Sequence, residues 1–142
     1  MKMVIIGRGN AGCISATHFA HYRNFIDTKV EIELIYDSSI PPVPTGQGTT
    51  LDFPDLLYET FNLGYLNKFP TTIKTGIMYE NFGKKNKNIF HHFPVGRYAL
   101  HFEPKQFQDF VCNNLNINFK ETDENIKKYN DIDADYIIDC RG

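Results

Sequence analysis

The chain has 142 residues, of which 42% are hydrophobic and 14% aromatic, and its formal net charge at pH 7 is -2. This length fits one domain with a core of its own. The balance of 15 basic and 17 acidic residues gives no electrostatic reason to expect binding to nucleic acid or to an anionic membrane. The chain starts at its first predicted strand, and no apolar run approaches the roughly 18 residues of a membrane span, so we expect a cytoplasmic protein.

The spacing of the cysteines and histidines gives no sign of a C-x-x-C pair or of a metal site. The three cysteines, Cys13, Cys112 and Cys140, lie far apart without a C-x-x-C pair, and an odd count suits reduced thiols. We interpret Cys13 as a small helix residue and the other two as core positions. The five histidines show no recognisable ligand spacing, so we predict no bound metal.

The most informative stretch lies at the start of the chain, where a short apolar run leads into a glycine-rich turn. The run Met3-Val4-Ile5-Ile6 predicts a strand, and Gly7-Arg8-Gly9-Asn10-Ala11-Gly12 follows the pattern G-x-G-x-x-G. In such a turn the first glycine permits the tight bend, the second lets a ligand approach the backbone, and the third lets a helix pack closely on the strand. The helix N-terminus then offers N–H groups and a positive dipole to a pyrophosphate.

A helix and a second strand complete this unit. We predict a helix from Ala11 to about Phe25 and a strand from Val30 to Tyr36, which together give a β-α-β unit of a Rossmann-like α/β domain binding FAD or NAD(P). Asp37 could accept hydrogen bonds from ribose hydroxyls, which would favour FAD or NAD over NADP. It could equally be an acid of a surface turn, because Tyr36 stands at the usual acidic position. The alternative for the whole unit is a glycine-rich turn that binds nothing.

The segment from Ile40 to Thr50 is rich in proline and glycine, and we predict neither helix nor regular strand there. Its small residues and its place after the second strand suit a loop laid along a flat cofactor. A helix is then predicted from about Leu51 to Gly64, with Asp52 as its N-cap and Pro54 in its first turn.

Lys74 stands in the middle of a β-branched run, Thr71 to Tyr79, that predicts a strand. Two interpretations remain open from the residues alone. The stem can pack while the ammonium reaches solvent, or a site can use the amine for chemistry. The other predicted elements are a solvated turn over 83–88, a helix opened by Pro104, a short strand over 117–119 and a buried strand over 134–142.

Several stretches together resemble the flavin-dependent tryptophan halogenase family, within the FAD-binding flavoprotein monooxygenases. The resemblance rests on five segments in the family's order. They are Gly7 to Gly12 before a helix; Ile40 to Thr49, similar to the loop I-P-x-x-G-x-G-E-x-T; Thr72 to Ile77, similar to T-F-K-x-x-I; His101-Phe102-Glu103 before a helix; and Ala134 to Gly142, similar to A-D-x-x-I-D-C-x-G. The lysine segment, in register with the others, is the most specific of these.

The resemblance implies a function and a set of site residues. Reduced FAD from a separate flavin reductase would react with O2 to give a flavin hydroperoxide, which a halide attacks to form hypohalous acid. Lys74 would position the hypohalous acid against a small aromatic, indole-like substrate and polarise its halogen–oxygen bond. The residues implied in cofactor binding are Gly7, Gly9, Asn10, Ala11, Gly12, Tyr36, Asp37, Val43, Thr45, Gly46, Gln47, Gly48, Thr49, Asp139 and Gly142.

The chain departs from the family pattern at Tyr36, where a glutamate is usual, at Gln47, where the loop has an acid, and at Phe82, where a tryptophan is usual. It contains no tryptophan, so the family's W-x-W-x-I-P motif is absent. We therefore expect residues 1–142 to be the N-terminal FAD-binding portion of a larger flavoprotein, with an incomplete monooxygenase-type fold that is not catalytically complete by itself. The alternatives are a fragment of another FAD-dependent monooxygenase or oxidoreductase, and an inactive truncated dinucleotide-binding module.

Overall fold

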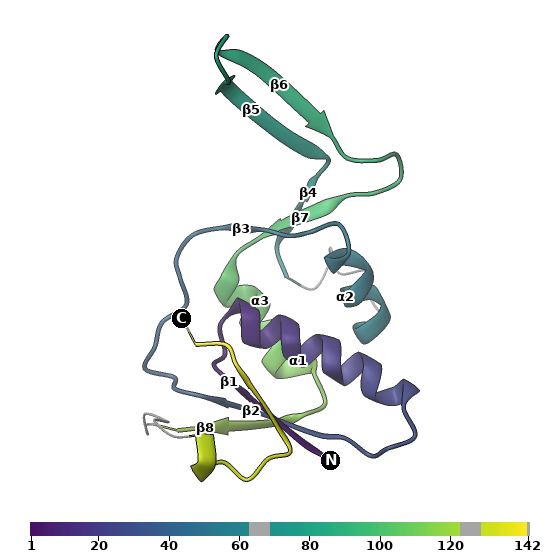
Figure 1. The fold of residues 1–142 in the computed structure, drawn as a ribbon, viewed down its shortest axis with the longest axis vertical. Helices are drawn as coiled ribbons and strands as arrows, with labels where there is room; N and C mark the ends of the chain where they lie inside the picture. Colours follow the sequence, from purple (N-terminus) through teal and green to yellow (C-terminus); the bar gives the residue numbers. More distant parts are fainter. Residues whose placement is uncertain (63–68, 123–128, 142) are drawn as a thin grey trace.

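The computed structural model describes residues 1–62, 69–122 and 129–141 (Figure 1). Its main sheet is parallel throughout, with the strand order β8-β2-β1-β9. Helix α1 (Asn10–Tyr22) connects the neighbouring parallel strands β1 and β2, so the predicted β-α-β unit and the Rossmann-like α/β class are confirmed. The four strands are β1 (Lys2–Ile6), β2 (Glu31–Tyr36), β8 (Asn118–Glu121) and β9 (Tyr136–Asp139).

Strand β1 lies in the centre of the main sheet because its side chains are apolar and can be buried on both faces. Successive side chains of a strand point to opposite faces. Ile5 accordingly joins the larger core cluster, whereas Val4 and Ile6 pack with Ile35 in a smaller cluster. Helices α1 and α3 (Pro104–Asn114) lie together on one side of the sheet (Figure 1). The larger core is therefore the one between the sheet and these helices.

Helix α1 packs closely on the sheet because its inner face carries small side chains. Cys13, Ala16, Thr17 and Ala20 are buried at helical spacing. The Thr17 hydroxyl donates a hydrogen bond to the Cys13 carbonyl at 2.8 Å, so this polar group is satisfied inside the core. The helix was predicted to reach Phe25 but ends at Tyr22, because the next three residues tighten into a 3₁₀ turn, η1 (Arg23–Phe25).

Phenylalanine rings fill the centre of the larger core. Phe107 of α3 is fully buried. Its ring centroid lies 5.0 Å from that of Phe102, 5.4 Å from Phe53 and 5.7 Å from Phe69. Helix α3, helix α2 (Phe53–Phe61) and strand β7 (Ala99–Phe102) thus meet at one side chain.

Replacing Phe107 by alanine is expected to lower the free energy of unfolding by about 3–5 kcal/mol, because the surrounding rings cannot fill the cavity. Urea denaturation followed by circular dichroism measures this loss. Phe25→Ala is the matched control, since Phe25 is 71% exposed. We expect the control to change the free energy of unfolding by less than about 0.5 kcal/mol. Equal effects of the two substitutions would contradict the central place of Phe107.

A second sheet is antiparallel, with the strand order β3-β7-β4. The proline-rich segment over 40–50 was predicted to be irregular, but it contains the short strand β3 (Gln47–Gly48), which pairs with β7. Thr49 fastens the segment to β7: its amide donates to the Leu100 carbonyl at 2.8 Å, and its hydroxyl accepts from the Leu100 amide at 2.9 Å. The end of the loop is therefore anchored to the sheet.

The single strand predicted over 71–79 is wrong, because the chain divides it between two sheets. Strand β4 (Thr71–Lys74) pairs with β7, and after Thr75 the chain continues as β5 (Gly76–Phe82), which pairs with β6 (Lys87–His92). Gly76 stands where the strands approach closely, since a Cβ atom there would lie 2.6 Å from the His91 carbonyl oxygen. A β-branched pattern predicts strand but not which partner each part will find.

The hairpin of β5 and β6 projects from the rest of the molecule (Figure 1). Its turn is shorter than the predicted 83–88, because β6 already begins at Lys87. Gly83 and Asn86 take the positive φ angles of the turn, 74° and 45°. Apolar side chains along the hairpin, among them Met78, Phe82 and Phe90, are exposed.

Helix α2 starts as predicted, but its N-cap makes a different contact. Asp52 takes the N-cap position, but its side chain makes no capping hydrogen bond and instead accepts from the Arg97 guanidinium at 2.6 Å. Pro54 lies in the first turn, as predicted. The helix ends at Phe61, with Asn62 in the left-handed conformation as C-cap, and the predicted continuation to Gly64 lies outside the described residues.

The last strand is less buried than predicted. Strand β9 pairs with β1 at an edge of the main sheet, and Tyr136 at its start is 58% exposed. The preceding strand, β8, is shifted from the predicted 117–119 to Asn118–Glu121. Burial of a strand depends on its neighbours as well as on its own apolar residues, and this is why the prediction failed.

Residues 1–62, 69–122 and 129–141 contain neither a membrane-spanning helix nor a cluster of metal ligands. None of their helices combines the length and the apolarity that crossing a membrane requires. The same ranges contain no group of three or more histidine, cysteine, aspartate and glutamate side chains arranged to hold a metal ion.

Candidate functional site

A cleft of about 960 Å³ lies at the carboxyl edge of the main sheet. Its walls come from the turn after β1, the ends of β2, β8 and β9, the loop after β2 and the start of α3. Figure 1 shows that long loop running around this end of the molecule before it reaches β3. Ligands of parallel α/β sheets bind at this edge, and the volume is at the upper end of the roughly 300–1,000 Å³ usual for small-molecule sites.

The glycine turn after β1 takes its shape from three backbone constraints. Gly7 has a φ of 101°, which favours glycine, and its amide donates to the Ile35 carbonyl at 2.8 Å. A Cβ atom at Gly12 would lie 1.8 Å from the Gly7 carbonyl oxygen, so α1 packs directly on the turn. A Cβ atom at Gly9 would meet nothing within 4 Å, and Gly9 lines the cleft. A ligand can therefore approach the backbone at Gly9.

Helix α1 begins at the cleft and directs its positive end into it. Gly9 is the N-cap residue and no side chain caps the first turn. Asn10 lines the cleft, and its Oδ1 accepts from Gln108 Nε2 at 3.0 Å, which ties the start of α1 to α3. Backbone N–H groups at a helix N-terminus suit a pyrophosphate. Ala11 is exposed outside the cleft, and Gly12 is buried behind the turn.

The end of β2 forms the next part of the cleft wall and carries Tyr36 and Asp37. The guanidinium carbon of Arg8 lies 4.2 Å from the centroid of the Tyr36 ring, a cation–π contact. Asp37 Oδ1 accepts from the hydroxyl and the amide of Ser39, at 2.6 and 2.8 Å. These two hydrogen bonds lower the pKa of Asp37. The predicted ribose-binding acid thus lines the cleft with one of its oxygens held in a turn.

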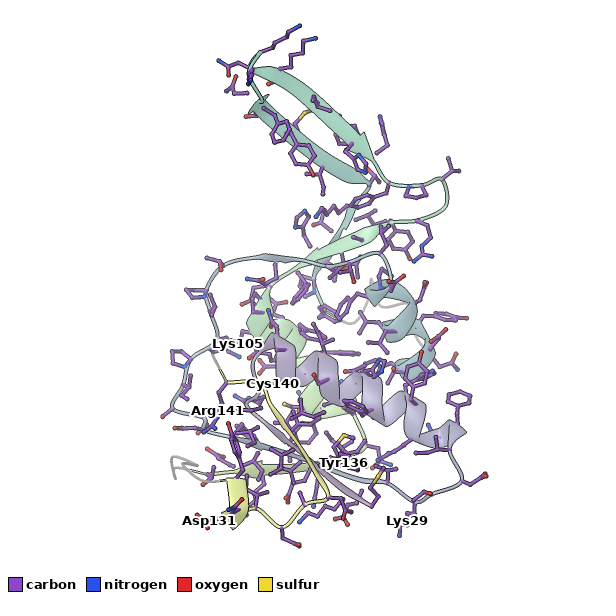
Figure 2. All side chains as sticks on the ribbon, in the orientation of Figure 1. Lys29, Lys105, Asp131, Tyr136, Cys140 and Arg141 are labelled. Atoms are coloured by element: carbon purple, nitrogen blue, oxygen red, sulfur yellow. The ribbon has the colours of Figure 1, made fainter. Side chains whose placement is uncertain are left out.

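Asp139 ends β9 at the cleft, and its carboxylate is already paired. The Arg141 guanidinium donates to its two oxygens at 2.9 and 2.7 Å, and the Tyr129 hydroxyl donates to Oδ2 at 2.8 Å. The bidentate pair with Arg141 holds the pKa of Asp139 well below its usual range. Figure 2 labels Cys140 and Arg141 in this segment, which follows β9. Gly142, the last predicted cofactor residue, lies outside the described residues.

The loop predicted to cover the cofactor divides between the cleft and the second sheet. Val43 and Gln47 line the cleft. Gln47 also begins β3, so the residues after it belong to the second sheet. The predicted cofactor residues of this loop that are not part of the cleft lining are Thr45, Gly46, Gly48 and Thr49.

Lys74 ends β4, opposite Ala99 of β7, and its ammonium lies against Gly48. A Cβ atom at Gly48 would lie 3.4 Å from Lys74 Nζ and 3.4 Å from Cε1 of His101. The centroid of the Phe93 ring is 5.7 Å from Lys74 Nζ. The amine therefore has a defined place beside the His101 imidazole and the Phe93 ring. It also lies next to Gly48, and the residue before Gly48, Gln47, lines the cleft.

The sequence matches a family model described as tryptophan halogenase over residues 2–131. The chain belongs to the tryptophan halogenase family. A search of curated protein sequences finds no match. The resemblance noted from the motifs is therefore confirmed at the level of the family.

Solved structures of halogenases share this fold. A tryptophan halogenase from Shewanella frigidimarina is 16% identical, with a TM-score of 0.77 over 100% of this chain. A tryptophan 6-halogenase from Streptomyces toxytricini is 17% identical, with a TM-score of 0.73 over 99%, and a flavin-dependent halogenase from Xanthomonas campestris is 15% identical, with a TM-score of 0.71 over 89%. The chain spans 42%, 42% and 36% of the lengths of these three proteins.

Among the cleft residues of this halogenase-family chain that were not predicted are Arg8, Gln108 and Arg141. Arg8 occupies a variable position of G-x-G-x-x-G, where the motif says nothing about the side chain. Gln108 is 98 residues from its partner Asn10, a separation at which the sequence holds no signal. Arg141 could have been found, because it belongs to the end of the strand predicted over 134–142, at the carboxyl edge of the sheet.

Alkylation of Cys112 in this halogenase-family chain is expected to titrate near neutral pH. The neighbouring Cys13 thiol, followed by the charge of Arg8, lowers the pKa of Cys112 to about 7. The same pairing and burial raise the pKa of Cys13. The iodoacetamide reaction rate of the Cys112 peptide, measured by mass spectrometry, should therefore have its midpoint near pH 7.

The lowered pKa of Cys112 also determines how the stability of the native state changes with pH. A thiol whose pKa is lowered by folding stabilises the native state above its unfolded pKa, about 8.5, and this contribution is lost as the pH falls through the folded value. Arg8→Gln should move the alkylation midpoint upward, because a favourable positive charge is removed. A wild-type midpoint at or above 8.5, the value for a free thiol, would contradict the pairing.

Proposed function

We propose that residues 1–142 form the FAD-binding portion of a flavin-dependent halogenase that acts on a small aromatic, indole-like substrate. The observation that carries this proposal is the continuity between the cleft and Lys74. Gln47 lines the cleft, and the next residue, Gly48, lies against the Lys74 ammonium. The loop that contains Gln47 and Gly48 therefore connects the cleft, which has the glycine turn of a dinucleotide site, to the Lys74 amine. Membership of the tryptophan halogenase family supports the same function.

The residues of the cleft fit FAD. The Gly7-to-Gly12 turn and the N-terminus of α1 would hold the pyrophosphate, where the open side of Gly9 leaves room for it. The end of β2 would hold the adenosine ribose, and Val43 and Gln47 would lie along the flavin. Bound FAD, reduced by a separate reductase, supplies with O2 the oxidising equivalent that turns halide into hypohalous acid.

The role proposed for Lys74 follows from its charge and its flexible stem. Its ammonium donates a hydrogen bond to the oxygen of hypohalous acid, which polarises the halogen–oxygen bond and stabilises the departing hydroxide. The electrophilic halogen is thereby presented to an electron-rich ring, and the position of the amine selects the ring carbon. His101 and Phe93 limit where the amine can lie.

Two other functions compete with this one. A different FAD-dependent monooxygenase would use the same cleft without needing Lys74. An inactive dinucleotide-binding module would need neither the lysine nor a second part. The exposed apolar side chains of the β5–β6 hairpin support a portion of a larger protein over a self-contained module, because further protein would cover such a surface.

Two measurements test the proposal. Titration of residues 1–142 with FAD, followed by flavin fluorescence, should show saturable binding. The protein made from its complete reading frame should then convert tryptophan or indole with bromide, O2 and reduced FAD into a product whose mass shows bromine in place of hydrogen. Flavin oxidation without halogenated product would favour another monooxygenase, and absence of FAD binding would favour the inactive module.

A further inference from the structure

At the adenosine end of the cleft, Tyr36 stands where Rossmann-like sites usually carry an acid, and an arginine of the glycine turn lies beside it. Strands β1 and β2 pair with Ile6 opposite Ile35, so the glycine turn and the end of β2 lie side by side. Arg8 of the turn holds its guanidinium carbon 4.2 Å from the ring centroid of Tyr36, the last residue of β2. Both residues line the cleft.

The acids near this corner are engaged in the surrounding loops. Asp37 Oδ1 accepts two hydrogen bonds from Ser39, and Glu121 at the end of β8 accepts one from the Ser38 hydroxyl. The other arginine of the cleft wall, Arg141, forms a bidentate pair with Asp139. Arg8 itself forms no ion pair with any acid in the described parts of the chain. Its charge is therefore available to a ligand of the cleft.

The Arg8 guanidinium is also held in place in the absence of a ligand. The Tyr36 ring supports one face of it. It also lies close enough to Cys112 of α3 to favour the thiolate of that residue. A planar guanidinium that is already oriented loses little side-chain freedom when it binds, and its N–H groups match the oxygens of a phosphate in a bidentate manner.

We propose that Arg8 and Tyr36 form the adenosine-ribose subsite of this cleft and that the subsite accepts an adenosine 2′-phosphate. A carboxylate at this place accepts hydrogen bonds from the ribose hydroxyls and repels a 2′-phosphate. Here the guanidinium and the Tyr36 hydroxyl donate to ribose oxygens, and the guanidinium attracts a phosphate. The inference rests on the proposed dinucleotide function and deepens it. It also replaces the selectivity expected from Asp37, which was for adenosine without a 2′-phosphate.

Two small probes test the subsite without flavin chemistry. AMP and adenosine 2′,5′-bisphosphate differ only in the 2′-phosphate, and each is titrated into residues 1–142 by calorimetry. We expect the bisphosphate to bind about tenfold tighter or more, the effect of one hydrogen-bonded charge pair. Arg8→Gln should remove the difference, and Tyr36→Glu should reverse it by adding a carboxylate. Lys29→Gln makes the same charge change at an exposed residue outside the cleft and should retain the difference.

The outcomes separate this inference from the function on which it rests. Equal binding of the two probes by the wild type, or a preference that a folded Arg8→Gln variant retains, would overturn the subsite. Thermal melting by circular dichroism establishes that each variant is folded, and if Arg8→Gln does not fold, Tyr36→Glu decides. A preference for the bisphosphate without FAD binding would support the subsite and refute the flavin function. FAD binding without a preference for the bisphosphate would support the flavin function and overturn the subsite.

Discussion

Replacing Lys74 by methionine is expected to abolish halogenation by the protein made from its complete reading frame while FAD binding and flavin oxidation continue. Methionine has a similar length but no charge, so it cannot donate a hydrogen bond to hypohalous acid or polarise its halogen–oxygen bond. Removal of one preorganised donor costs roughly 100-fold to 1,000-fold in rate. Brominated product, measured by mass spectrometry per flavin oxidised, should fall by at least this factor. Lys74 is not part of the cleft lining, so the affinity for FAD should be unchanged.

The matched control is Lys29→Met, which removes the same charge from an exposed residue and should leave halogenation at the wild-type rate. Lys74→Arg is informative as well, because it retains the charge on a larger, planar group that must fit beside Gly48 and His101. We expect partial activity with altered product distribution from this variant. Undiminished halogenation by Lys74→Met would refute the role of the lysine and leave another flavin monooxygenase activity as the better interpretation.

Replacing Gly12 by alanine is expected to destabilise the domain by more than about 3 kcal/mol and to abolish FAD binding. A Cβ atom at this position would lie 1.8 Å from the Gly7 carbonyl oxygen and 2.9 Å from the Gly7 carbonyl carbon. Both are backbone atoms, so no flexible side chain can move aside. The start of α1 must shift away from the turn, and the N–H groups at the helix N-terminus shift with it. Urea denaturation and FAD titration measure the two effects.

Gly9→Ala separates the two effects in the same turn. A Cβ atom at Gly9 would meet nothing within 4 Å, and the residue has a φ of -65°, which alanine adopts without strain. We therefore expect stability within about 0.5 kcal/mol of the wild type. FAD affinity should nevertheless fall about tenfold or more, because the added methyl group stands where the pyrophosphate approaches the backbone. Loss of stability in Gly9→Ala equal to that in Gly12→Ala would contradict this division of roles.

The start of the chain could be predicted from the sequence because its signals are local. An apolar run, three glycines at fixed spacing and a following helical segment each act over a few residues, and β1, its turn and α1 lie where the patterns place them. The helix opened by Pro104 was predicted for the same reason, and in the structure Glu103 caps it by accepting from the Lys105 and Gln106 amides. The β-α-β unit, and with it the fold class and the place of the cleft, was thus determined by the sequence itself.

Only the tertiary structure decided which distant residues meet. It placed Arg8 on Tyr36, brought Lys74 to Gly48 and His101, and divided one predicted strand between the second sheet and a projecting hairpin. These contacts depend on strand order and register, which a β-branched or alternating pattern does not encode. The exposure of β9 has the same origin, because a strand is buried or exposed according to what lies beside it. Local patterns determined the elements of this protein, and pairing across the chain determined the chemistry of its cleft.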